Sequence, residues 1–218
     1  MPDEILRRPI SARDTRWAHA TAAWLARLGI RPNTISILSV IFAAGAAACL
    51  FGLGRSESLL SRILLPVGAA VCIQLRLLCN LFDGMVAVEQ QQRTKSGEIF
   101  NELPDRFADA FILAGSGYAS RFPEWLVELG WTTAVLAVIT AYVRSLGAAV
   151  GAGQFFLGPM AKQHRMATMT GLCLALAVLA NWQERWTLVV AGLTAISLGC
   201  LVTIARRSVR IVQTLESR

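Results

Sequence analysis

Long apolar segments without a charge are the feature that most constrains this chain of 218 residues. Residues 35–53, 166–183 and 186–205 contain no Asp, Glu, Lys or Arg. A helix needs about 20 mostly apolar residues to cross the hydrocarbon core of a bilayer. The composition, 55% hydrophobic and 16% charged, excludes collagen-like, disordered, coiled-coil and disulfide-scaffold proteins. The sequence therefore predicts an all-α integral membrane protein.

Six transmembrane helices are predicted, with a cytoplasmic N-terminus and an interfacial amphipathic helix (1–32) before them. The expected spans are residues 33–53, 60–88, 104–122, 129–150, 165–183 and 186–206, which together make one domain over 33–206. Residues 11–28 place Trp17, Ala20, Trp24 and Leu28 on one helical stripe, a pattern typical of a helix in the membrane interface. The alternative is an ordinary amphipathic helix packed on protein. Residues 207–218 are expected to form a basic cytoplasmic tail.

The distribution of basic residues predicts how the chain lies in the membrane. Of the 21 lysines and arginines, Arg76 lies inside the second predicted span, where it could pair with an acidic group or extend to the interface. Four face outward on the predicted topology, Arg55, Arg62, Arg121 and Arg185, and the remaining 16 face inward. Basic residues collect on the cytoplasmic side. We therefore expect an inner-membrane protein with both termini in the cytoplasm, and the net charge of +7 needs no nucleic-acid partner.

Oxygen-bearing side chains gather at one depth of the second and third predicted spans. In the second span, Asn80, Asp83, Gly84 and Ala87 follow one helical face, and Gly97, Asn101, Asp105 and Asp109 then recur at intervals of four. Carboxylates and amides without Cys or His favour Mg²⁺, Mn²⁺ or Ca²⁺ over zinc. The two glycines would let a phosphate or nucleotide approach the backbone. Ionisable residues inside a membrane indicate function by default.

One pattern joins these two rows: Asn80-x2-Asp83-Gly84-x2-Ala87-Val88-x8-Gly97-x3-Asn101-x3-Asp105. It resembles the signature of the CDP-alcohol phosphotransferases, which is Asp-x2-Asp-Gly-x2-Ala-Arg-x8-Gly-x3-Asp-x3-Asp. Every spacing agrees. The string RPNTIS at 31–36 and the layout of an interfacial helix followed by six spans are also similar to the family, so the resemblance covers most of the chain.

The resemblance implies two Mg²⁺ or Mn²⁺ ions and assigns roles to the matching residues. Metal ligands would be Asp83 and Asp105, with Asn80 and Asn101 at the other two ligand positions, and Asp105 would also be the general base. Asp109 lies one turn beyond Asp105, outside the signature, and is a candidate to compensate for the lost charge. CDP would contact Asn80, Asp83, Gly84, Ala87 and Gly97. Three positions depart from the family pattern. Asn80 and Asn101 keep an oxygen but lose a charge, and Val88 replaces an arginine, for which Arg93, Arg106 or Arg144 could substitute.

The activity implied by the resemblance belongs to phospholipid synthesis. A phosphatidyl or phospho-alcohol group would move from a CDP-alcohol, expected to be CDP-diacylglycerol, to the hydroxyl of a small polar acceptor, with release of CMP. Basic residues expected to bind the acceptor or a phosphate are Arg144, Lys162, Arg165 and Arg93. For Lys162 and Arg165 the alternative is plain anchoring at the cytoplasmic face. A homodimer is expected by analogy with the family.

Two other classes of function compete with the transferase. Because two family aspartates are amides here, the chain could be a catalytically lapsed relative that binds a lipid or nucleotide. A transporter or channel is disfavoured, since its polar residues should trace a path across the bilayer, whereas these gather at one depth. The sequence leaves the acceptor open among glycerol 3-phosphate, an inositol phosphate, serine and another phospholipid.

Overall fold

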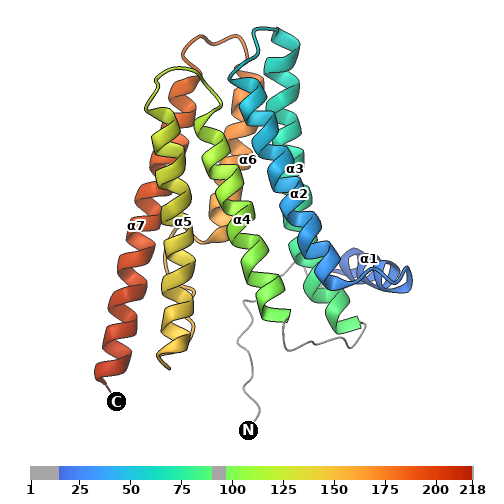
Figure 1. The fold of residues 1–218 in the computed structure, drawn as a ribbon, viewed down its shortest axis with the longest axis vertical. Helices are drawn as coiled ribbons and strands as arrows, with labels where there is room; N and C mark the ends of the chain where they lie inside the picture. Colours follow the sequence, from blue (N-terminus) through green and yellow to red (C-terminus); the bar gives the residue numbers. More distant parts are fainter. Residues whose placement is uncertain (1–14, 90–96, 218) are drawn as a thin grey trace.

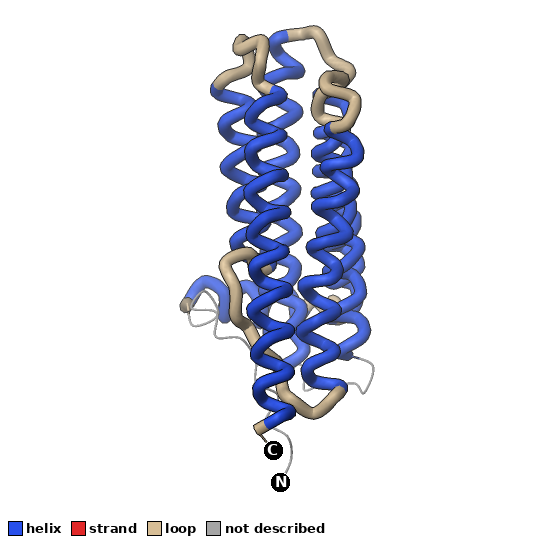
Figure 2. Tube along the Cα trace, turned by 90° about the vertical axis from the view of Figure 1, so that its left-hand side faces the viewer, coloured by secondary structure: helices blue, strands red, loops and turns tan. Residues whose placement is uncertain are grey.

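The computed structural model describes residues 15–89 and 97–217, and within these two ranges the chain forms seven helices and no strand (Figure 2). The helices are α1 (Arg16–Arg27), α2 (Pro32–Leu53), α3 (Leu59–Glu89), α4 (Gly97–Gly117), α5 (Leu126–Ala149), α6 (Lys162–Val178) and α7 (Trp186–Glu216). The predicted all-α fold is therefore confirmed.

The six long helices α2 to α7 run up and down in one elongated bundle (Figure 1). Helix α2 packs on α3 and α4, α4 packs on α5, and α5 packs on α7. Helix α6 lies against α3 and α7. The lower ends of α3 and α4 in Figure 1 therefore lie at the same end of the bundle as α1 and the C-terminal end of α7.

Four of these helices, α2, α3, α5 and α7, are long and apolar enough to cross a membrane. By length and composition they identify an integral membrane protein. The other two predicted spans, which correspond to α4 and α6, do not meet this criterion of length and apolar composition. Helix α6 has only 17 residues, and α4 carries several charged residues, including Asp105, Arg106 and Asp109.

Helix α1 projects sideways from the lower half of the bundle (Figure 1). Its small residues Ala18 and Ala22 are buried in a cluster with apolar residues of α3, including Phe82. The ring of Trp17 meets Phe82 edge-on at 6.0 Å between centroids. The stripe of Trp17, Ala20, Trp24 and Leu28 is exposed, so α1 packs on protein through one face and leaves its aromatic face uncovered.

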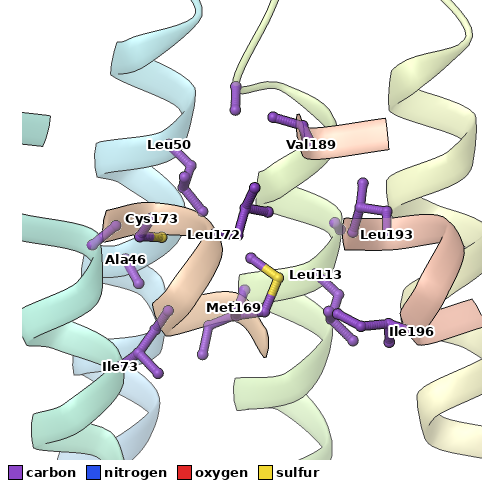
Figure 3. Close-up of a cluster of buried hydrophobic side chains, with 14 of the residues drawn as sticks. Ala46, Leu50, Ile73, Leu113, Met169, Leu172, Cys173, Val189, Leu193 and Ile196 are labelled. Atoms are coloured by element: carbon purple, nitrogen blue, oxygen red, sulfur yellow. The ribbon is translucent and has the colours of Figure 1, made fainter. Parts of the chain in front are cut away.

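The apolar core lies between the long helices, and α6 contributes to it from Met166 to Leu176. Figure 3 shows Leu50, Leu113, Met169 and Leu193 directed toward one another from α2, α4, α6 and α7. Small residues bring the helices close: a Cβ added to Gly115 of α4 would lie 2.7 Å from the Cβ of Ala47 in α2. Close contact through small residues is the usual way that membrane helices pack.

Three helices differ clearly from their predicted bounds. Helix α6 runs over Lys162–Val178 instead of 165–183. Helix α4 begins at Gly97 and continues through Pro104, whereas the prediction started the span at 104. A proline inside a helix removes one backbone hydrogen bond, and here the helix continues across it. Helix α7 extends to Glu216 instead of 206, because Arg207 and Ile211 are buried and hold its last turns against neighbouring segments.

The segment between α5 and α6 returns along the bundle before α6 begins, so α6 starts about halfway up (Figure 1). Arg207 of α7 donates to the carbonyl of Leu157 at 2.9 Å, and the Met160 amide donates to the Thr203 hydroxyl at 3.1 Å. Gly158 has a positive φ of 110°, and a Cβ there would lie 2.6 Å from Thr203. This docking fixes the position of Lys162 and Arg165 in the first turn of α6.

Candidate functional site

Three carboxylates from α3 and α4 are buried at the lower half of the bundle. Asp83, Asp105 and Asp109 are only 5%, 6% and 1% exposed. Asp83 lies near the end of α3, and the other two lie one turn apart in α4. A buried carboxylate is costly unless it is paired and hydrogen-bonded, so the partners of each one define what this site can do.

Asp105 is surrounded by donors from three helices. Its Oδ1 accepts from Nδ2 of Asn80 at 2.9 Å and from Nη2 of Arg76 at 3.3 Å. Its Oδ2 forms an ion pair with Nζ of Lys162 and lies 3.8 Å from Nη2 of Arg106. Both oxygens of the signature carboxylate therefore already have cationic partners.

Asp109 lies between two arginines. Nη2 of Arg76 donates to its Oδ1 at 2.7 Å, and Nη2 of Arg165 donates to its Oδ2 at 2.6 Å. Arg165 also donates to the Thr140 hydroxyl of α5 at 3.1 Å. Arg76, Asp105, Asp109, Lys162 and Arg165 thus form one network across α3, α4 and α6, which we call the ion-pair cluster.

Asp83 has neutral partners. Oγ of Ser36 in α2 donates to its Oδ2 at 2.8 Å, and the backbone amide of Gly84 donates to its Oδ1. Asn80, which donates to Asp105, precedes Asp83 by three residues on the same face of α3. The two signature carboxylates, which lie on different helices, therefore belong to the same polar region.

A second, more exposed group of charges continues from Asp105 toward α5. Glu102 accepts from Arg144 at 2.5 Å and from Arg106 at 3.3 Å. The guanidinium of Arg144 also lies 5.6 Å from the ring centroid of Phe156. Arg144 therefore borders the ion-pair cluster from α5.

The structure places most of the predicted site residues in or beside this region. Asn80, Asp83, Asp105, Asp109, Lys162 and Arg165 share the contacts described above, and Arg144 borders them. Gly84 contacts Asp83, Ala87 lies one turn further along α3, and Gly97 is the first residue of α4. Arg93 and the side chain of Asn101 lie outside the described parts of the chain.

Four residues of the site were not assigned to it from the sequence. Ser36 and Thr140 are hydroxyls in apolar spans. Arg207, which donates to the backbone carbonyl of Thr140 from α7, was assigned to the basic tail. Arg76 was expected to pair with an unspecified acidic group or to extend to the interface. Arg76 is fully buried and contacts both Asp105 and Asp109. Arg76 could have been assigned to the site from the sequence, because it lies one helical turn before Asn80. No comparable pattern in the sequence points to Ser36, Thr140 or Arg207.

The donor set of this region does not fit a pair of divalent ions. Among the described residues no group of three or more His, Cys, Asp and Glu side chains could hold a metal. Asp105 and Asp109 form ion pairs with four basic side chains, and a divalent ion at these oxygens would be repelled by them. Asn80 turns its amide nitrogen, a donor, toward Asp105, whereas a metal ligand must offer an oxygen.

Comparison with known proteins gives a match only at the level of structure. No protein-family description matches the sequence, and no curated protein matches it either. The fold is similar to that of phosphatidylinositol phosphate synthase (PgsA1) of Mycobacterium tuberculosis, a member of the CDP-alcohol phosphotransferase family. The predicted family resemblance is therefore matched by a shared fold.

Three structures of that synthase are similar to this chain, each at 18% identity. The one with CDP-DAG bound has a TM-score of 0.73 and covers 90% of this chain and 94% of its own. The complex with manganese and citrate has a TM-score of 0.72, with 89% and 88% covered. The apo form has a TM-score of 0.68, with 88% and 94% covered. At this identity the comparison shows the common fold.

Proposed function

We propose that this chain is an integral membrane CDP-alcohol phosphotransferase. Its proposed substrate is a CDP-linked lipid of the CDP-diacylglycerol type. The observation that carries the proposal is the convergence of Asp105 with Arg76, Lys162 and Arg165 in one buried region, with the second signature carboxylate, Asp83, one turn from Asn80, which contacts Asp105. The same fold occurs in a synthase whose structure was solved with CDP-DAG bound. Fold alone does not imply function, so the side chains of this region bear the argument.

The proposed reaction is displacement at phosphorus. The acceptor hydroxyl oxygen bonds to the β-phosphorus of the CDP-lipid, the bond from that phosphorus to the bridging oxygen breaks, and CMP leaves with the electron pair. Asp105 accepts the hydroxyl proton. Phosphoryl transfer depends mostly on positioning and charge stabilisation, which the basic side chains of the ion-pair cluster can supply to the phosphates.

Arg144 is the proposed contact for a phosphate or other anion on the acceptor. It lies on the more exposed side of the region, paired with Glu102, whose side chain is 41% exposed. A soluble acceptor and CMP would exchange there with the cytoplasm, while the lipid enters from the inner leaflet. This orientation, with both termini cytoplasmic, rests on the distribution of basic residues.

The divalent-metal requirement implied by the resemblance is the one part that the described side chains do not support. The neighbouring synthase was solved with manganese, so Mn²⁺ and Mg²⁺ are included as variables in the assay. No step proposed here for Asp105 or Arg144 requires a metal.

The test is CMP release from labelled CDP-diacylglycerol by the purified protein in lipid nanodiscs, with a panel of acceptors, in Mn²⁺, Mg²⁺ or EDTA. We expect release with at least one acceptor and a loss of about a hundredfold in Asp105→Ala, the usual effect of losing a general base. Glu124→Ala, which removes an exposed carboxylate in the α4–α5 connection, is the matched control. CDP binding without CMP release with any acceptor would contradict transfer and favour the lapsed relative.

A further inference from the structure

We propose that the ion-pair cluster binds the diphosphate of a CDP-linked substrate with its own basic side chains, without a divalent ion. This inference rests on the proposed function and concerns how the same site holds its ligand. It starts from the disagreement between the metal-dependent signature and the side chains that the fold brings together here.

The first step is the amide of Asn80. Its Nδ2 donates to Oδ1 of Asp105 at 2.9 Å. An aspartate at this position would place a second carboxylate against Asp105, and two adjacent carboxylates cannot both stay ionised unless a cation lies between them. The asparagine replaces that repulsion with a hydrogen bond. The contact between α3 and α4 therefore no longer needs a metal ion.

The second step is the balance of charge. The ion-pair cluster contains three basic residues, Arg76, Lys162 and Arg165, against two carboxylates. It is therefore net positive by one charge, and including Asp83 makes it neutral. Aspartates at positions 80 and 101, as in the family signature, would add two negative charges, which is the charge of one divalent cation. The chain lacks those two negative charges and has basic side chains next to the carboxylates that remain.

The third step is the unused hydrogen-bonding capacity of the arginines. Nε and Nη1 of Arg76 and Nε of Arg165 are buried and have no acceptor among the described residues. A buried donor without an acceptor is destabilising. Guanidinium groups form strong, often bidentate hydrogen bonds with phosphate and carboxylate oxygens, and the carboxylates of this cluster already accept from other donors. The ligand class that matches these donors is a diphosphate.

The experiment measures the affinity of CDP for the protein in nanodiscs by isothermal titration calorimetry, once in EDTA and once in Mn²⁺. For the wild-type chain we expect dissociation constants that agree within about twofold. Asn80→Asp restores the family carboxylate and should weaken binding in EDTA at least tenfold, with recovery in Mn²⁺. Asn181→Asp adds the same charge at an exposed position beyond the far end of α6 and should behave like the wild type.

Each outcome decides between the alternatives. CDP binding by the wild type only in Mn²⁺ would overturn the inference and leave the proposed function intact. No CDP binding in either condition would overturn both. If Asn80→Asp is not monodisperse, Lys162→Gln takes its place and should weaken CDP binding at least tenfold in EDTA, and an unchanged affinity would overturn the inference. Stoichiometric Mn²⁺ binding by the wild type, measured by electron paramagnetic resonance, would also contradict it.

Discussion

Two levels of the bundle, one at the middle of α6 and one at its first turn, are built from the same helices. They differ in the side chains that lie between those helices. Around the middle, Leu113 and Met169 pack in an apolar core (Figure 3). One turn away along the same helices, Asp109 and Arg165 form a buried ion pair at 2.6 Å. Apolar packing is non-directional and tolerates changes that keep volume, whereas a buried charge depends on its specific partner.

This difference shows that stability of the fold alone does not explain the buried charged residues near the first turn of α6. A helix bundle could bury apolar side chains at both levels, and replacing buried ion pairs by apolar residues is often neutral or stabilising. The ion-pair cluster is therefore better explained by a ligand than by folding. Four predictions test this contrast, from the largest expected effect to the smallest.

Asp109→Ala should have the largest effect on stability, because it leaves Arg76 and Arg165 buried without their shared carboxylate. We expect the free energy of unfolding to fall by about 3–5 kcal/mol, measured by SDS-induced unfolding in mixed micelles. Glu128→Ala, at an exposed position of α5, should change it by less than about 0.5 kcal/mol. Equal losses for the two variants would contradict a specific ionic contact.

Met169→Ala should lower the free energy of unfolding by about 3 kcal/mol, because it opens a cavity in the apolar half. Met169→Leu keeps the volume and should lower it by less than about 1.5 kcal/mol. Met169 is fully buried, and the same unfolding assay gives both values. If the leucine variant were as damaging as the alanine variant, packing in this half would be as partner-specific as in the ion-pair cluster.

Ser36→Ala removes the hydroxyl that donates to Asp83 at 2.8 Å. A hydrogen bond to a charged group contributes about 1.5–3 kcal/mol, and we expect a loss near the lower value in the free energy of unfolding. Ser39→Ala is the matched control on the same helix, since Ser39 donates only to the backbone carbonyl of Ser36. A loss in Ser39→Ala as large as in Ser36→Ala would show that the contact with Asp83 is not what matters.

Glu102→Gln should have the smallest effect. The Glu102 side chain is 41% exposed, so water and salt screen its pairs with Arg106 and Arg144. We expect a loss below about 1 kcal/mol that decreases further when the unfolding assay is repeated at high salt. A loss as large as that of Asp109→Ala would place Glu102 energetically inside the ion-pair cluster.

Much of the fold could be predicted because its signal is local. Long apolar runs located α2, α3 and α5 within about three residues, since the length and polarity of a helix are set by consecutive residues. Helix α7 continues beyond 206, the predicted end of the span, for the opposite reason. Its last turns are held by the burial of Arg207, which donates to the backbone carbonyl of Thr140 in α5 at 2.6 Å, and a long-range contact leaves no mark in the local pattern.

The site was predictable to the extent that its residues recur along one helix. The spacing of Asp105 and Asp109 placed them on one stripe of α4, and the structure has them one turn apart with a shared partner. The pairing of Lys162 and Arg165 with these carboxylates was not predictable, because it depends on how the segment 150–161 docks on α7. The amide of Asn80 looked like a weakened metal ligand in sequence, and only its contact with Asp105 shows that it acts as a donor.

The central claim is that the diphosphate of a CDP-linked substrate is held by the basic side chains of the ion-pair cluster. The most direct test is a crystal structure of the protein grown with CDP and Mn²⁺, with anomalous diffraction recorded at the manganese edge. The account predicts phosphate oxygens within hydrogen-bond distance of Arg76 or Lys162 and no anomalous peak between them and Asp105. Manganese peaks joining the phosphates to Asp83 and Asp105, or CDP bound away from these residues, would contradict it.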